Sequence, residues 1–94
     1  MKQIIADLKE QAEAIRSEIR SYEVAIEKRT VRYVKLVAKR DLSEEADEVR
    51  TMLSEMIRTA EENKKRAEKR LSFVLQAIAY ATLAEGESLK KIEE

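Results

Sequence analysis

A series of apolar residues in the first half of the chain is spaced alternately by three and four positions. Its members are Ile5, Leu8, Ala12, Ile15, Ile19, Tyr22, Ile26, Arg29, Tyr33 and Leu36. Only Arg29 is charged, and the residues between them are mostly Lys, Arg, Glu and Ser. This spacing draws one stripe along an α-helix and is typical of the seam of a coiled coil. It predicts a first helix over about residues 2–39.

The second half of the chain repeats the pattern. Its members are Ala46, Val49, Leu53, Met56, Ala60, Lys64, Ala67, Leu71, Val74, Ile78 and Ala81. Two steps of four follow one another between Met56 and Lys64, a stutter that locally unwinds a supercoil. The pattern predicts a second helix over about residues 43–85. Gly86 suits the position after a helix end, so we expect a tail over 86–94 that frays or forms a short third helix capped by Ser88.

The junction of the two helices lies where the charge changes sign, in "VAKRDLSEEADEVRTML" (37–53). Cations precede Asp41 and carboxylates follow it, which complements the C-terminal dipole of one helix and the N-terminal dipole of the next. Asp41 and Glu44 match a capping box, and Ser43 is a competing cap. A tight turn is predicted at residues 40–42.

Turn-forming residues are scarce, because the 94 residues include one Gly and no Pro. The chain therefore turns rarely. We predict an all-α fold with a single domain over 1–94, a long antiparallel two-helix hairpin that resembles a coiled coil. Folding at the predicted turn places Tyr22 opposite Ala60 and Ile15 opposite Ala67, over a length of roughly 60 Å.

Composition excludes most chemistry. There is no His and no Cys, so disulfides, thiol chemistry and most transition-metal sites are excluded. No Gly-rich phosphate loop or nucleophile motif occurs, so we expect neither an enzyme nor a cofactor or metal site. Lys and Arg together number 19, as do Asp and Glu, and few aromatic residues interleave with the cations, which argues against nucleic-acid binding.

The start of the chain, "MKQIIADLKEQ", carries charges where a signal peptide would be apolar. No apolar run approaches the ~18 residues of a membrane-spanning helix. We expect a cytoplasmic chain whose membrane contact is peripheral.

The sequence contains more apolar residues than one seam can bury. Val24, Val31, Val34 and Ala38 form a second stripe beside the first, and residues 71–84 are apolar almost all round. Two interpretations stay open: the chain is a fragment that has lost its covering parts, or these residues mediate self-association of a homo-oligomer. The residues predicted for self-association are Val24, Val31, Val34, Phe73, Leu75, Tyr80 and Leu83.

A basic stripe lies on one face of the first helix. It consists of Lys28, Arg32, Lys35 and Lys39, and no carboxylate lies between residues 28 and 40. Three roles fit it: binding of anionic lipid head groups, contact with the acidic run of a neighbouring subunit, and simple solvation. A second basic segment, 58–70, is diluted by Glu and is better explained as solvated surface. Arg29 either specifies the helix register or, as we prefer, extends its head group to water.

The stretch "LVAKRDLSEEADEVRTMLSEMIRTAEENKKRAEKRLSFVLQAI" resembles the core hairpin of the ESCRT-III family, most closely its archaeal cell-division (CdvB) branch. The matching features are the basic residues and Asp at 39–41, Ala46 at the start of an Ala-rich helix, the segment 55–58, and the Leu-rich segment 71–78.

The resemblance implies a subunit that polymerises through laterally packed hairpins into filaments on the cytosolic face of membranes, for remodelling, scission or cell division. A basic face of the hairpin would contact anionic lipid. A later helix that folds back on the hairpin tip, and a C-terminal motif gripped by an AAA ATPase, are family features with no counterpart in these residues. Without that helix, apolar residues near the tip would be uncovered, among them Val49 and Met52. The alternative is a generic coiled-coil adaptor or four-helix dimerisation module that binds a protein partner.

Overall fold

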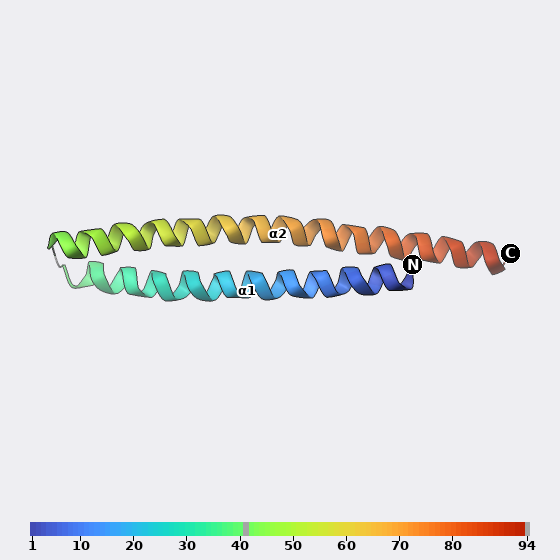
Figure 1. The fold of residues 1–94 in the computed structure, drawn as a ribbon, viewed down its shortest axis with the longest axis horizontal. Helices are drawn as coiled ribbons and strands as arrows, with labels where there is room; N and C mark the ends of the chain where they lie inside the picture. The colour runs from blue at the N-terminus through green and yellow to red at the C-terminus, as the bar shows by residue number, and fades with distance from the viewer. Residues whose placement is uncertain (41, 94) are drawn as a thin grey trace.

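Two helices make up the fold in the computed structural model, which describes residues 1–40 and 42–93, and side chains up to residue 86. Helix α1 spans Lys2–Ala38 and helix α2 spans Glu44–Glu93. They run antiparallel, side by side, from the turn to the N-terminus (Figure 1). The molecule measures 76 × 16 × 14 Å. The predicted all-α hairpin is confirmed.

The interface between α1 and α2 coincides with the predicted seams, because every seam position is buried or half-buried. The most buried apolar residues are Ala12, Ala46, Leu53, Ala60, Ala67 and Ala81. Alanines let two helices approach closely, but they bury little apolar surface each. Leu53 is the one large side chain that is fully buried among the described residues. The interface between the two helices therefore contains few large side chains that are fully buried.

The two charged seam residues place their head groups at the edge of the interface. Lys64 Nζ lies 3.5 Å from Glu23 Oε1 on α1 and 3.8 Å from Glu68 Oε1 on its own helix. Arg29 is half-buried and lines a surface groove, which agrees with the interpretation that its guanidinium reaches water.

The turn joins the helices through residues 39–43. Ser43 caps α2, because the Ala46 N–H donates a hydrogen bond of 3.2 Å to Ser43 Oγ. The competing capping box depends on Asp41, which lies outside the described residues. Arg40 adopts a left-handed conformation with φ of 53°, and its N–H donates to the Val37 carbonyl at 3.1 Å. A left-handed residue just after the last helical turn is a common way for a helix to end.

The predicted end of the second helix at about residue 85 is wrong, and so is the separate tail over 86–94. Helix α2 continues through Gly86 to Glu93, and Gly86 does not have a positive φ. A Gly inside a helix costs only about 1 kcal/mol relative to Ala, and the residues that follow are mostly good helix formers with no Pro. With 50 residues against 37, α2 extends beyond the N-terminus of α1, which explains a hairpin longer than expected (Figure 1).

Candidate self-association and membrane-contact surface

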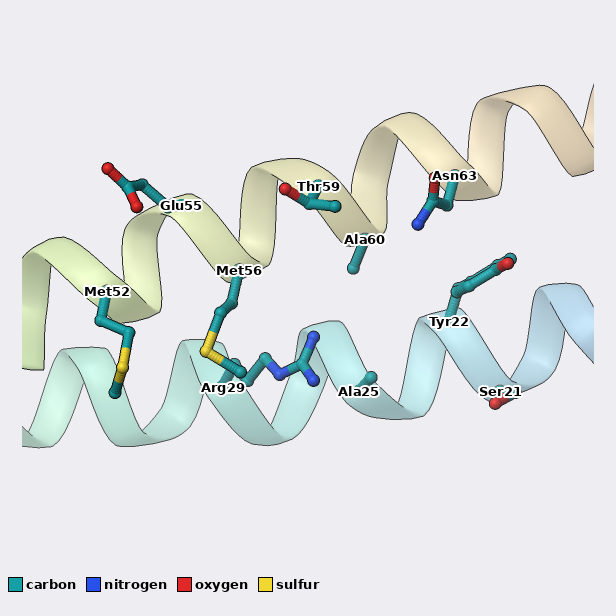
Figure 2. Close-up of a pocket in the computed structure, with 10 residues that line it drawn as sticks. All are labelled: Ser21, Tyr22, Ala25, Arg29, Met52, Glu55, Met56, Thr59, Ala60 and Asn63. Atoms are coloured by element: carbon teal, nitrogen blue, oxygen red, sulfur yellow. The ribbon is translucent and has the colours of Figure 1, made fainter.

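A shallow groove runs between the helices on one side of the hairpin. From α1 it is lined by Ser21, Ala25 and Arg29, and from α2 by Met52, Glu55 and Thr59. Figure 2 shows Tyr22 and Met56 projecting into the space between the helices, whereas Glu55 points away from α1. We call the side on which this groove opens the front face.

The predicted basic stripe continues the front face of α1 toward the turn. Lys28 and Lys35 follow Ser21 at intervals of seven residues, and Arg32 and Lys39 follow Ala25 in the same way. Residues seven apart lie on nearly the same side of a helix. All four cations, which we call the basic row, are exposed. None of them forms an ion pair with another residue in the described part of the chain.

A second row of charged residues lies on α2 and was not predicted from the sequence. Glu48 and Glu62 lie seven residues on either side of Glu55, and Glu45 lies seven residues before Met52. These four exposed carboxylates, which we call the acidic row, share the front face and have no ion-pair partner among the described residues. The regular spacing of Glu48, Glu55 and Glu62 was the signal that could have revealed the row.

The second apolar stripe of α1 is exposed, but it lies opposite the seam and not beside it. Val24, Val31 and Val34, which we call the valine stripe, are 49%, 46% and 57% exposed. Val31 is two residues from each of the seam residues Arg29 and Tyr33, and two residues correspond to about 200° of rotation. The valine stripe therefore points away from α2. It borders the basic row, since Lys28 follows Val24 by one helical turn.

The apolar residues predicted for self-association on α2 are exposed but do not form one patch. Phe73 lines a front-face groove with Ala14 and Glu18, and Tyr80 follows Phe73 by seven residues. Leu75 is about 200° around α2 from Phe73, so it faces the other side of the hairpin.

Leu83 is likewise about 200° from the seam residue Ala81 and points outward. It is 63% exposed. The predicted self-association residues therefore lie on at least three sides of the molecule.

A polar cluster on the front face bridges the two helices. Glu18 Oε1 accepts a hydrogen bond of 2.8 Å from Arg70 Nη2 and one of 2.9 Å from Tyr22 Oη. The hydrogen bond from Arg70, followed by that from Tyr22, lowers the pKa of Glu18 below its ordinary value of 4.5. The same bond to the Glu18 carboxylate raises the pKa of Tyr22 above 10.0. Only the folded chain brings Arg70 to this pair.

Reactive or metal-binding groupings are not a feature of the described residues. No three of their carboxylates lie close enough together to hold a metal ion. Over the same residues, neither helix contains a stretch both long and apolar enough to cross a membrane. What the described surface offers is contact area: two charged rows and several exposed apolar side chains.

Comparison of the chain with protein-family models, with curated proteins and with solved structures finds no match.

Proposed function

We propose that this chain is a non-enzymatic, self-assembling scaffold subunit of ESCRT-III type, which forms filaments on the cytosolic face of an anionic membrane during remodelling, scission or cell division. The observation that carries the proposal is the valine stripe, about half exposed along its length and bordered by a basic row that has no ion-pair partner among the described residues. The resemblance to the ESCRT-III hairpin, which covers about residues 4–84, supports the type of assembly.

Self-association follows from the balance between buried and exposed apolar groups. Five of the six apolar residues that are buried most completely are alanines, whereas the residues of the valine stripe remain about half exposed. Large exposed apolar side chains that lie together mark contact sites. Covering the valine stripe with another copy would bury apolar surface that the hairpin itself cannot reach, because the stripe faces away from α2.

Membrane contact follows from the basic row. Each cation near an anionic surface contributes about 1 kcal/mol, so four cations on one face provide a peripheral attachment of about 4 kcal/mol at low salt. Such attachment needs no membrane-spanning segment.

The test is sedimentation of the protein with anionic and with neutral vesicles, followed by electron microscopy of the pellets. We expect co-sedimentation with anionic vesicles only, decreasing with salt, and filaments on their surface. A discrete dimer that ignores lipid would contradict the proposal and favour the coiled-coil adaptor or four-helix dimerisation module.

Two double charge-reversal variants test whether the basic row is the lipid site. Arg32→Glu with Lys35→Glu should abolish co-sedimentation while circular dichroism shows unchanged helix content. Arg58→Glu with Lys65→Glu makes the same charge change at two exposed positions of α2 that lie off the front face and should reduce co-sedimentation only slightly. Equal losses in both variants would show that net charge, and not the basic row, governs binding.

A further inference from the structure

We propose that, away from lipid, the front face binds the front face of a second copy about a two-fold axis parallel to the long axis of the hairpin. Both turns would then lie at the same end of the pair. The inference rests on the self-association in the proposed function and names the surface, the symmetry and the consequence for lipid binding.

The charges on the front face support this pairing. The basic row lies on α1 and the acidic row on α2, on the same face and over the half of the hairpin next to the turn. Eight exposed charges in two rows of opposite sign have no ion-pair partner among the described residues. A surface that carries both signs in separate rows is complementary to a copy of itself when the rows are exchanged.

The two-fold symmetry brings rows of opposite charge together. A half-turn about the long axis places α1 of one copy over α2 of the other and keeps every residue at the same distance from the turn. Both rows begin near the turn, with Lys39 and Glu45, so each basic row would face Glu45, Glu48 and Glu55 of the partner, and Glu62 would lie about two helical turns beyond Lys28. The interface repeats this pairing twice.

An end-for-end rotation loses that complementarity. It would place the basic row over the N-terminal half of the partner's α1, where the front-face grooves are lined by Gln11, Ala14 and Glu18. The anions on that part of the face are Glu18, which is already bonded to Arg70, and Asp7, which lies seven residues before Ala14. The charges therefore favour the arrangement with both turns at one end.

The front face is large enough for a stable interface. The hairpin is 76 Å long and 16 Å wide, and a stable interface needs about 800 Å² from each partner. The same pairing would cover Phe73, 60% exposed, with the N-terminal part of the partner's α1. The valine stripe would stay outside the pair, because it lies opposite the seam.

A consequence for lipid binding follows, since one set of cations serves both contacts. In the pair, the partner's acidic row would lie against the basic row, so the basic row could not contact lipid head groups. Anionic lipid would compete with the partner for these cations and separate the pair at the membrane.

The charges are tested by a swap. One variant carries Lys28→Glu, Arg32→Glu and Lys35→Glu, and the other carries Glu48→Lys, Glu55→Lys and Glu62→Lys. Analytical ultracentrifugation without lipid should show association weakened at least about tenfold in each variant alone, and restored in an equimolar mixture as a one-to-one pair. Restoration also shows that both variants are folded.

Unchanged association of either variant alone, or failure of the mixture to associate while both remain helical, would overturn the proposed interface. A wild-type chain that stays monomeric at all concentrations would instead contradict the self-assembly on which the proposed function depends.

The symmetry is tested by distance. The chain has no Cys, so Leu42→Cys, at a position in the turn that is 92% exposed, carries a single spin label. Double electron–electron resonance should give a distance below about 30 Å within the pair, whereas an end-for-end pair would give more than about 50 Å. A long distance would refute the axis even if the charge swap succeeds.

The competition with lipid is tested by neutralisation. Glu48→Gln, Glu55→Gln and Glu62→Gln together should strengthen binding to anionic vesicles more than the same change at three exposed carboxylates off the front face, Glu10, Glu27 and Glu61. Equal strengthening in both variants would show that the acidic row does not mask the basic row.

Discussion

Arg70 on α2 and Glu18 on α1, 52 positions apart in the chain, are joined by a hydrogen-bonded ion pair of 2.8 Å. The carboxylate oxygen that Arg70 binds also accepts the Tyr22 hydroxyl at 2.9 Å. The cluster lies on the front face near the middle of α1, where it helps to set the axial position of one helix against the other.

The cluster of Glu18, Arg70 and Tyr22 should make the free energy of unfolding depend on pH in both acid and alkaline solution. The pKa of Glu18 is lowered in the folded chain, so its contribution is present above the unfolded value near 4.5 and is lost as pH falls through the folded pKa. The pKa of Tyr22 is raised, so its contribution is present below about 10.0 and is lost as pH rises through the folded pKa.

Glu18→Gln is the variant that isolates the acid side of this behaviour. Chemical denaturation should show the wild type more stable than Glu18→Gln at neutral pH, with the difference vanishing in strong acid. A constant difference across the acid range would contradict the linkage. NMR titration of the Glu18 carboxyl gives an independent measurement of its pKa.

Leu53→Ala should be the most destabilising single truncation in the seam. Leu53 is 1% exposed and is the one large side chain fully buried among the described residues. Loss of such a side chain costs about 2–5 kcal/mol of unfolding free energy, measured by urea denaturation. Leu42→Ala removes the same atoms from a side chain that is 92% exposed and should change stability by less than about 0.5 kcal/mol. Similar effects at the two positions would mean that the hairpin interior is not where the structure places it.

Arg40→Gly should stabilise the turn. Arg40 has φ of 53°, a conformation that costs a residue with a Cβ about 1–2 kcal/mol and costs Gly nothing. Part of that gain is offset by the greater freedom of Gly in the unfolded chain, so we expect a net gain of up to about 1 kcal/mol in thermal or chemical denaturation. Arg40→Ala keeps the Cβ and serves as the control; a gain equal to that of Gly would point to the removed charge as the cause.

Gly86→Ala should stabilise the extension of α2. A Cβ added at Gly86 meets nothing within 4 Å, and the residue does not have a positive φ. Ala is favoured over Gly inside a helix by about 0.5–1 kcal/mol. Slower amide hydrogen exchange around position 86 would show the effect, and faster exchange would indicate that the helix ends there.

Val31→Ser should weaken filament formation. Val31 belongs to the valine stripe and is 46% exposed, so covering it would remove part of an apolar side chain from water. Losing that contribution should raise the critical concentration roughly five- to tenfold, measured by sedimentation with anionic vesicles. Val37→Ser is the matched control, because Val37 is 49% exposed but lies about 120° around α1 from Val31, beside a groove at the turn that Leu42 also lines. Equal effects would assign the loss to general surface hydrophobicity.

The alternating three- and four-residue spacing was sufficient to predict which side of each helix is buried. Apolar side chains at that spacing have only one way to leave water together, so the seams from Ile5 to Leu36 and from Ala46 to Ala81 are readable from the chain alone. The scarcity of Gly and Pro was likewise enough to predict two long helices and one turn.

The sequence predicted Arg40 at the turn but not its left-handed conformation, and it was a poor guide to Gly86. Gly favours a helix end, but a helix ends only where capping bonds compensate for its unpaired carbonyls, and continuation costs little where no Pro follows. The turn instead places an Arg in the left-handed conformation, because the chain must reverse at that point to close the seam.

Only the tertiary structure decided which polar side chains meet across the seam. Periodicity identifies the buried side of each helix, but it does not say how the long polar side chains that flank that side are directed. The structure joins Glu18 to Arg70 and Glu23 to Lys64. The sequence by itself determined the two amphipathic rods, and their packing decided which surfaces are left for a membrane or for another copy.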